Sequence, residues 1–368
     1  MERSIQGQIA MIVFCLLVVM PLSAFSADGQ IKINTAPFVI NKSGSYVLTS
    51  NLVVTDPDAN AITIEVNDVT LDLNGHTVQG PNIGSGNGTG IYARNRYSIT
   101  VRNGRVWGFY SHGIELGSDI GDPSYKGAGH IVEGVQVANN GLYGIAIVGG
   151  NLSNCTVNNN GRDGIFAINS TLVNSTANNN LHDGIVILSS TLANCTANNN
   201  GDGGIDATDS TLTNCNATGN PYGISPIDCT LVNCTANRNN LRGIGPLRCT
   251  LKNCTANYNQ EMGIFDYGES ILANCATNLN GVTGIYAQSN TVLVNCTANG
   301  NSGYGIHAFD KCRIEGNTIR GNGSFGLYLE DTGNYAIRNV AGGNTSGNYV
   351  QSVGNYVPFT GDNGNYSF

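Results

Sequence analysis

The chain has 368 residues, of which 40% are hydrophobic and 11% charged, so it can bury a sizeable core while taking most of its polarity from uncharged residues. Glycine is common, at 49 residues, and the formal net charge is -8. That charge excludes a polyanion bound through charge alone, because neutralising phosphates requires clustered lysine and arginine. Nucleic acid is therefore not an expected partner.

The first residues have the pattern of a secretory signal peptide. Arg3 precedes an apolar run over residues 9–22, and small residues follow over 23–27. This pattern predicts a signal peptide over residues 1–27, cleaved between residues 24 and 27. The run is short for a membrane span, and no later segment is apolar enough to be one. We expect an exported protein, secreted, periplasmic or at the cell surface, without a transmembrane segment after signal removal.

A Gly-Ile or Gly-Leu pair recurs along the chain and defines an internal repeat. From Ile145 onward the pair returns every 19 to 21 residues. The second residues of the pairs are Ile91, Ile114, Ile145, Ile165, Ile185, Ile205, Ile224, Ile244, Ile264, Ile285, Ile306 and Leu327. Such regularity means that each repeat is one structural unit.

Each unit consists of short alternating segments broken by asparagine or glycine, as in STLANCTANNNGDGGIDAT over residues 190–208. No stretch has helical periodicity, so the units are strands. The repeat predicts an all-β solenoid of about twelve coils with three short strands each, stacked at the strand spacing of about 4.8 Å. We expect an N-terminal cap over residues 28–60, the stack over 61–333 and a C-terminal cap over 334–368, because an open sheet edge would invite aggregation.

Equivalent residues of successive coils form columns, and three columns follow from the recurring Asn-Cys-Thr sequence. The asparagine, as at Asn194, aligns with Gly134 and so predicts a left-handed bend with amides stacked along the stack. The threonine is expected to point outward, in an array that is ordinary β-surface or could meet an ordered ligand such as ice. The cysteines are expected to pack inward as small hydrophobes. They are Cys155, Cys195, Cys215, Cys234, Cys254, Cys275 and Cys296.

Disulfides between these cysteines remain open in an exported chain. Cβ atoms on adjacent coils should lie about 4.8 Å apart, which is longer than a relaxed bridge prefers. Cys229 and Cys249, in a second column, are the pair to test first, and the column from Cys195 to Cys296 is the other candidate. Because no histidine is interleaved with these thiols, no metal site is predicted.

Several segments together resemble bacterial right-handed parallel β-helix repeat proteins with the pectin-lyase-like fold. They are NDVTLDLNGHTVQG at residues 67–80, the Gly-Ile coils, and GNTSGNYVQSVGN at 343–355. PFVINKSGSYVLTSNLVV at 37–54 is similar to the N-terminal cap of such proteins. The resemblance implies a right-handed parallel β-helix. It implies little about activity, since this fold carries polysaccharide lyases, polygalacturonases, alginate epimerases, tailspikes, adhesins and accessory proteins of copper-enzyme maturation.

The sequence motifs of two enzyme classes with this fold are missing. The sequence lacks the Asn-Thr-Asp, paired-Asp, Gly-His-Gly and Arg-Ile-Lys series of polygalacturonases and the Asp-Pro-His-Glu signature of alginate epimerases. We therefore expect a binding or scaffold protein for an extended carbohydrate, with no cofactor. The alternative is a polysaccharide lyase or glycoside hydrolase, and a lyase would add Ca²⁺. A third hypothesis is an ice- or surface-binding protein that uses the threonines.

Charged residues near the Gly-Ile pairs supply the catalytic candidates. Asp209, Asp228 and Arg248 occupy one column, four residues after the isoleucine. A second charged cluster just before the pair comprises Arg162, Asp163, His182, Asp183 and Asp202. Both sets are also explained as solvated turn residues, because aspartate before glycine is common in bends.

Aromatic residues in the slot after the isoleucine give the candidate sugar-binding residues, because aromatic rings stack on pyranose faces. The residues in this slot are Phe166, Phe265, Tyr286 and His307, and Tyr267 is nearby. Asp206 and Asp266, beside the charged column, complete the binding candidates. The aromatic stripe is interrupted by Val186, Asp206, Ser225 and Gly245. The five histidines of the chain are scattered and supply no copper-binding cluster.

Overall fold

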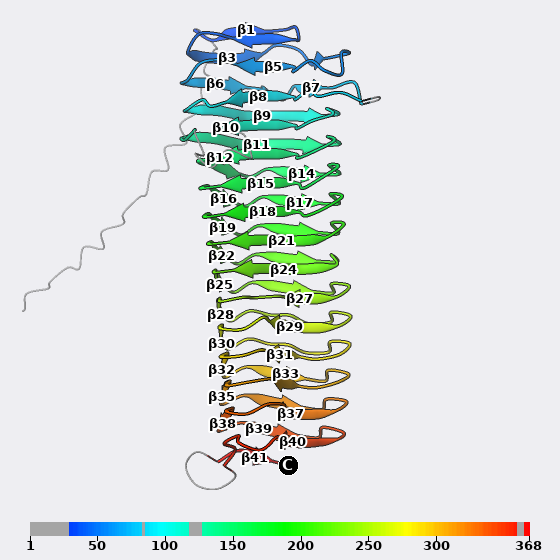
Figure 1. The fold of residues 1–368 in the computed structure, drawn as a ribbon. Helices are drawn as coiled ribbons and strands as arrows, with labels where there is room; N and C mark the ends of the chain where they lie inside the picture. Colours follow the sequence, from blue (N-terminus) through cyan, green and yellow to red (C-terminus); the bar gives the residue numbers. More distant parts are fainter. Residues whose placement is uncertain (1–28, 83–84, 118–126, 359–363) are drawn as a thin grey trace, which may run out of the picture.

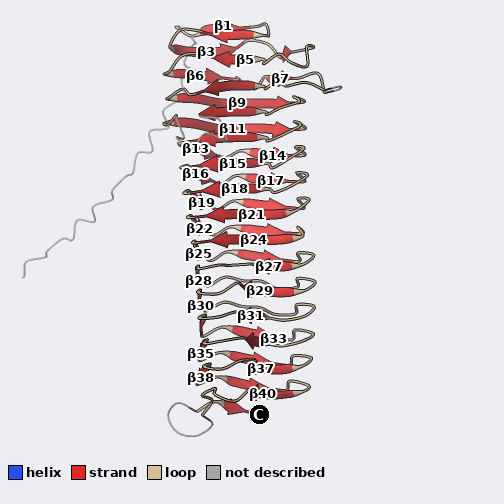
Figure 2. Cartoon of the chain, viewed as in Figure 1, coloured by secondary structure: helices blue, strands red, loops and turns tan. Residues whose placement is uncertain are grey.

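The computed structural model describes residues 29–82, 85–117, 127–358 and 364–368. In these ranges the chain winds into a tall stack of coils, a right-handed parallel β-helix with strands but no helix (Figures 1 and 2). The predicted fold class is therefore confirmed. The predicted signal peptide lies outside the described residues. No helix in the described ranges is long and apolar enough to span a membrane.

The isoleucines of the Gly-Ile pairs lie on one parallel sheet, here called the isoleucine sheet, which has fifteen strands within the described residues. Its strands are β2 (Phe38–Ile40), β5 (Ile62–Ile64), β8 (Ile91–Arg94), β10 (Ile114–Gly117), β12 (Ile145–Val148), β15 (Ile165–Ile168), β18 (Ile185–Leu188), β21 (Gly203–Thr208), β24 (Tyr222–Ile227), β27 (Arg242–Ile244), β29 (Met262–Asp266), β31 (Ile285–Ala287), β34 (Ile306–Ala308), β37 (Phe325–Leu329) and β40 (Gly347–Gln351). The twelve Gly-Ile or Gly-Leu pairs predict twelve coils. The sheet has three more strands, β2, β5 and β40, because these strands lie in coils that lack the pair.

The remaining strands form the other sides of the coil, in two further sheets. The larger contains β1 (Ile31–Ile33), β3 (Gly44–Leu48), β4 (Leu52–Val53), β6 (Val69–Asp72), β7 (Thr77–Gln79), β9 (Ile99–Trp107), β11 (His130–Ala138), β13 (Gly150–Ser153), β14 (Thr156–Asn158), β16 (Thr171–Val173), β17 (Thr176–Asn178), β19 (Thr191–Ala193), β20 (Thr196–Asn198), β22 (Thr211–Thr213), β23 (Asn216–Thr218), β25 (Thr230–Val232), β26 (Thr235–Asn237), β28 (Thr250–Lys252), β30 (Ile271–Ala273), β32 (Val292–Val294), β35 (Arg313–Glu315) and β38 (Tyr335–Ile337). The smaller contains β33 (Thr297–Asn299), β36 (Thr318–Arg320), β39 (Val340–Gly342) and β41 (Tyr366–Ser367).

The asparagine before each cysteine makes the bend between two strands of a coil, as the sequence predicts. Asn194 has φ 54°, and Gly134 in the aligned position has φ 61°. Its side-chain amide also bonds along the column, since Asn194 Nδ2 donates to Asn174 Oδ1 at 3.2 Å. The left-handed backbone and the exposed amide ladder both explain why asparagine recurs in this position.

The core consists of stacked identical or similar side chains. Ile185 pairs with Ile165 and Ile205, and Leu192 pairs with Leu172 and Leu212, all at most 1% exposed. Because each side chain sits directly on its counterpart, the interior repeats with the coil and fills the space between the sheets. The stack is therefore one continuous core, and its surface columns keep a fixed register.

A second asparagine ladder lies inside the stack, where the sequence analysis did not place one. Each of its asparagines is at most 8% exposed. The ladder runs through Asn140, Asn160, Asn180, Asn200, Asn220, Asn239, Asn259, Asn280, Asn301, Asn322 and Asn344. Side-chain amides donate to the Oδ1 atom of the next coil, so buried polar groups at this turn are satisfied by the neighbouring coil.

The cysteines face inward, and the ten described cysteines are free thiols that are buried. Burial raises the pKa of Cys155 and of Cys195 to about 11. Cys229 and Cys249 occupy a slot that holds serine in other coils, and the Cys229 backbone N–H donates to Cys249 Sγ at 3.3 Å. No disulfide joins the predicted pair in this structure.

The threonine that follows the cysteine slot of the Asn-Cys-Thr sequence faces outward in register and is exposed at Thr156 and half-buried at Thr176 and Thr196. A second outward column, which was not predicted, holds Thr171, Thr191, Thr211, Thr230 and Thr250, which are all exposed. The described part of the chain thus has two unlike surfaces: uncharged threonine and asparagine columns on one side of the coil, and the more varied outward residues of the isoleucine sheet on the other.

Candidate functional site

The outward face of the isoleucine sheet carries the least repetitive side chains of the stack. The residue after each buried isoleucine points outward, and the sheet register aligns these residues along the stack. Asp206 pairs with Ser225, and Phe265 pairs with Tyr286. Gly245 falls between Ser225 and Phe265, after the end of the short strand β27.

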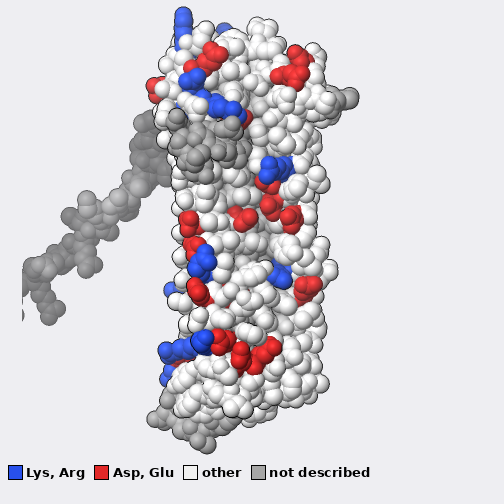
Figure 3. All heavy atoms as spheres, viewed as in Figure 1, with Lys and Arg blue, Asp and Glu red and all other residues white. Residues whose placement is uncertain are grey.

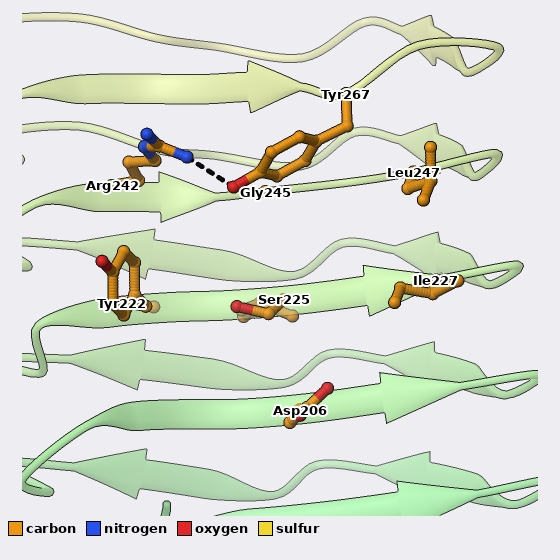
Figure 4. Close-up of a pocket in the computed structure, with 10 residues that line it drawn as sticks. Asp206, Tyr222, Ser225, Ile227, Arg242, Gly245, Leu247 and Tyr267 are labelled. Atoms are coloured by element: carbon orange, nitrogen blue, oxygen red, sulfur yellow. Dashed lines mark hydrogen bonds between the residues drawn. The ribbon is translucent and has the colours of Figure 1, made fainter.

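Where the side chains of this outward column are small, at Ser225 and Gly245, the surface has a hollow of about 350 Å³, here called the Gly245 hollow. Its walls include Asp206 on β21, Ser225 on β24, and Leu247 and Tyr267 in the segments that follow β27 and β29 (Figure 4). The full lining is Asp206, Tyr222, Gly223, Ile224, Ser225, Ile227, Arg242, Gly245, Leu247 and Tyr267. One carboxylate, one guanidinium, one hydroxyl and two phenol rings therefore meet over four neighbouring coils.

Tyr267 reaches across Gly245 to Arg242. Arg242 Nη1 donates to the Tyr267 hydroxyl at 2.5 Å, and Figure 4 shows the phenol ring extended between the two coils. The Arg242 guanidinium also lies 3.9 Å from the centroid of the Phe265 ring. A side chain at position 245 would contact the Tyr267 ring, since a Cβ there would be 3.5 Å from Cε2. Glycine thus leaves room for the bridge.

The aromatic column continues from the hollow toward the C-terminus. Phe265 and Tyr286 stack with ring centroids 4.9 Å apart and an interplanar angle of 4°. His307 contacts the Tyr286 ring at 4.8 Å, edge to face. Parallel stacking covers the ring faces of Phe265 and Tyr286 with each other, so they offer mainly edges to a ligand. Tyr267 differs, because its ring is at 71° to that of Phe265 and is 46% exposed.

Two further aromatic residues extend this column beyond those predicted from the sequence. Tyr328 pairs with His307 in the sheet, and the Tyr304 and Tyr328 rings stack at 5.3 Å. His307 Nε2 lies 2.6 Å from Glu330 Oε2. Burial lowers the pKa of His307, and Glu330 opposes that shift. Tyr304 could have been found from the sequence, because it stands two residues before the isoleucine, like Tyr222 and Arg242.

Four carboxylates, here called the aspartate row, lie toward the N-terminal side of the hollow: Asp163, Asp183, Asp202 and Asp206. Asp163 Oδ1 accepts the backbone N–H of Asp183 at 3.2 Å, and Asp183 Oδ1 accepts that of Gly203 at 2.7 Å. Burial, followed by the charge of Asp163, raises the pKa of Asp183 to about 6. Burial likewise raises the pKa of Asp206, with added repulsion from Asp163 and Asp202.

The second charged cluster predicted from the sequence is thus partly brought together. Burial and the charges of Asp163 and Asp202 raise the pKa of Asp183, and Arg162 and His182 lower the pKa of Asp163 against the larger effect of burial. Arg162 also lies over the Tyr143 ring at 4.9 Å. In the space-filling view, carboxylates gather near the middle of the stack on a surface that is otherwise mostly uncharged (Figure 3).

The residues predicted as catalytic lie at the bend after the isoleucine sheet. All three have left-handed backbone, with φ 49° at Asp209, 56° at Asp228 and 52° at Arg248. Arg248 Nε and Nη2 donate to the two carboxylate oxygens of Asp228, each at 2.7 Å. This pairing lowers the pKa of Asp228. The structure joins Asp228 and Arg248 as an exposed ion pair, and none of the three residues lines the hollow.

Of the predicted binding residues, Asp206 and Tyr267 line the hollow, and Phe265, Tyr286 and His307 form the aromatic column beside it. Asp266 and Phe166 belong to neither. Asp266 is fully buried, because it is in the inward register position paired with Ala287, and it accepts a hydrogen bond from the Thr291 hydroxyl. Burial raises its pKa. Phe166 contacts the Tyr143 ring, with centroids 5.3 Å apart, near the aspartate row. Among the described residues, no group of histidine, cysteine and acidic side chains is arranged to hold a metal ion.

The coil architecture and this varied outward face define the class of protein as a parallel β-helix repeat protein. The chain belongs to the family described as right handed beta helix region, whose model matches residues 122–228 and 227–345. No curated protein matches the sequence.

Solved structures share the fold at low sequence identity. The A-module of the Azotobacter vinelandii mannuronan C-5 epimerase AlgE6 is 15% identical, with 89% of this chain and 91% of that chain covered and a TM-score of 0.49. The catalytic domain of a GH87 alpha-1,3-glucanase in complex with tetrasaccharides is 13% identical, with coverage of 83% and 63% and a TM-score of 0.43. The Dettilon tailspike protein is 16% identical, with coverage of 89% and 60% and a TM-score of 0.35. These similarities concern the coil and carry no argument about activity.

Proposed function

We propose that the chain is an exported binding protein for an extended carbohydrate, which it holds on the outward face of the isoleucine sheet at the Gly245 hollow. The polymer lies along the coils, with one sugar unit in the hollow and its neighbours over the adjoining outward residues. Export to the periplasm, the cell surface or the medium belongs to the same proposal.

The single observation that carries this proposal is the composition of the hollow. A pyranose ring has an apolar face and a rim of hydroxyl groups, so its site needs an exposed aromatic face with polar groups around it. Tyr267 supplies a half-exposed ring, and Asp206, Ser225 and Arg242 surround the same space with acceptors and donors. The hollow is open on the surface of a rigid sheet, so an extended chain can continue past it in both directions.

The test is binding of the purified mature chain to a panel of soluble polysaccharides, measured by affinity electrophoresis and calorimetry. Tyr267→Ala should weaken the binding by about tenfold or more, because it removes the stacking surface. Tyr258→Ala is the matched control, since Tyr258 is 50% exposed and also lies beside an arginine, Arg238 at 5.3 Å, but does not line the hollow. Equal loss in both variants, or no binding to any polysaccharide by the folded chain, would refute the proposal.

A second candidate function is cleavage of the polymer by a lyase or hydrolase mechanism. The observation that favours it is the position of Asp206, a partly buried carboxyl group of raised pKa that lines the hollow beside the other aspartates. A carboxyl group whose pKa is raised keeps its proton more readily than an ordinary aspartate, as a general acid requires. The predicted residues Asp209, Asp228 and Arg248 stay a separate hypothesis for the same activity.

Product release separates the two candidates. The chain is incubated with polyuronates and neutral glycans, with and without Ca²⁺, and unsaturated or reducing ends are measured. If products appear, Asp206→Asn and the double variant Asp209→Asn with Asp228→Asn show which group of carboxylates acts. Binding without products leaves the binding function alone, and thermal hysteresis of the same preparation would instead favour the threonine columns as an ice-binding surface.

A further inference from the structure

Arg242 is the positively charged residue of the Gly245 hollow, and Asp206 is the negatively charged one. The guanidinium is held by the Phe265 ring on one side and by the Tyr267 hydroxyl at 2.5 Å. It forms no ion pair with the carboxylates of the described residues, and its buried Nε has no hydrogen-bond partner among them. Because Nε is buried, the N–H groups that this guanidinium can offer to a ligand in the hollow are those of its Nη atoms.

The chemistry of such a group favours an anion. A guanidinium presents its N–H donors in a planar fork that matches a carboxylate or a sulfate, and ring contacts that fix its plane reduce the entropy lost on binding. Phe265 and Tyr267 provide these contacts on two sides of Arg242. The sugar unit in the hollow is therefore expected to carry an acidic group.

The residues next to the hollow favour uncharged units instead. Toward the N-terminus the outward face continues into Asp206 and the rest of the aspartate row, whose carboxylates already repel one another. A polymer with an acid on every unit would place anions against this row, and like charges in contact are unfavourable. Toward the C-terminus the face continues into the aromatic column of Phe265 and Tyr286, which also offers no cation.

From this charge pattern we infer that the bound polymer carries spaced acids: one acidic unit in the hollow on Arg242, flanked by neutral units over the aspartate row and the aromatic column. The inference rests on the proposed function. The acid is a uronate carboxylate or a sulfate ester, since both match the guanidinium. A homopolymer of acidic units is excluded as the preferred ligand by the same argument.

The experiment compares polymers that differ in charge but not in backbone. The first pair is hyaluronan, which has a uronate on alternate units, and its carboxyl-reduced form. The second set is polygalacturonate with none, half or nearly all of its carboxyl groups methyl-esterified. Keratan sulfate, with sulfate and no uronate, distinguishes the two sources of the acid. Affinity is measured for the full mature chain at two salt concentrations, because charge pairing weakens with ionic strength.

The expected results are tighter binding of hyaluronan than of its reduced form, or an affinity maximum at intermediate esterification. Arg242→Gln should remove this preference with about a tenfold loss for the charged polymers, while Arg242→Lys should keep part of it. Asp206→Asn should improve binding of the unesterified polymer several-fold. Tyr267→Phe removes the hydrogen bond to Arg242 but keeps the aromatic ring. It therefore tests whether this bond positions the Arg242 guanidinium, without loss of the stacking surface.

Opposite results would overturn the inference. If neutral polymers bind as well as spaced acids, and Arg242→Gln changes neither, Arg242 has no role in selecting an acid. If affinity rises steadily with charge, the aspartate row does not exclude acidic homopolymers. Either result leaves carbohydrate binding at the hollow standing as the proposed function. Failure of every glycan, neutral or acidic, to bind the folded chain would refute both the proposed function and this inference.

Discussion

Asn180 donates from its side-chain Nδ2 to Oδ1 of Asn200 at 3.0 Å, and the Asn180 backbone N–H donates to the same oxygen at 3.0 Å. Asn200 Nδ2 in turn donates to the carbonyl of Ala177 at 3.1 Å. Both asparagines are at most 3% exposed. The Asn200 side chain therefore satisfies three buried groups on the preceding coil. The same arrangement, repeated along the stack, makes the turn before the isoleucine sheet rigid.

Asn200→Ala should destabilise the protein by about 3 kcal/mol, because buried donors on Asn180 lose their acceptor. Chemical denaturation checks the size of the effect, and hydrogen exchange should show the faster exchange concentrated in the adjacent coils. The control is Asn194→Gly, which removes an exposed ladder amide but keeps the left-handed bend, and it should cost less than about 1 kcal/mol. Equal losses of stability in the two variants would mean that the buried asparagine ladder contributes no more to stability than the exposed one.

Asp183 makes the stability dependent on pH. Its pKa in the folded chain is about 6, above its ordinary value of 3.8, because burial and Asp163 disfavour the charged form. The unfolded chain therefore holds the charge more easily, so stability falls as pH rises from about 4 to about 6 and stays lowered above that range.

Asp183→Asn should remove this dependence and stabilise the protein by about 1–2 kcal/mol at pH 7, a figure reduced for the partial exposure of the side chain. Thermal unfolding at pH 4 and pH 7 measures the difference. Asp228→Asn is the control of opposite sign, because its pairing with Arg248 lowers its pKa. A stabilisation by Asp183→Asn that is as large at pH 4 as at pH 7 would contradict the titration argument.

The regular repeat allowed the fold to be predicted from the sequence. The functional site was harder to predict, because it lies where the residues of the repeat vary. Asn194 was placed at a bend because glycine and asparagine share one slot, and the structure confirms it. The inward position of Asp266 followed from the alternation after Ile264, since Ala287 fills the same slot in the next coil. The prediction chose Asp266 as a carboxylate beside the charged column of Asp209 and Asp228, and did not apply this alternation.

The Gly245 hollow could not be predicted from the repeat, because it depends on side chains that cross between coils. Arg242 and Tyr267 are 25 residues apart, and their hydrogen bond crosses a space that a large side chain at position 245 would fill. The buried asparagine ladder was missed for a different reason. The sequence shows several consecutive asparagines in each repeat, and only the register of the coils determines which of them points inward.

The thiols should be unreactive until the stack unfolds. The ten described cysteines are buried and free, so a reagent cannot reach them in the folded chain. At Cys155 and Cys195 a pKa raised to about 11 also leaves almost no thiolate at pH 8. Labelling with a thiol reagent, followed by mass spectrometry, should modify the described thiols only above the unfolding transition. Thr191→Cys, at an exposed position, is the control and should react at once in the folded protein. Unfolded chains that resist labelling would reveal disulfides.

Gly245 offers the sharpest test of the hollow itself. A Cβ at this position would lie 3.5 Å from Tyr267 Cε2, an ordinary contact, so Gly245→Ala should fold normally and keep the affinity for the polymer within about twofold. Gly245→Leu is different, because its larger side chain must fill the hollow or push Tyr267 away from Arg242. We expect about a tenfold or greater loss of affinity with the melting temperature nearly unchanged. Undiminished binding by folded Gly245→Leu protein would move the carbohydrate site away from the hollow, to the aromatic column near Tyr304 and Tyr328.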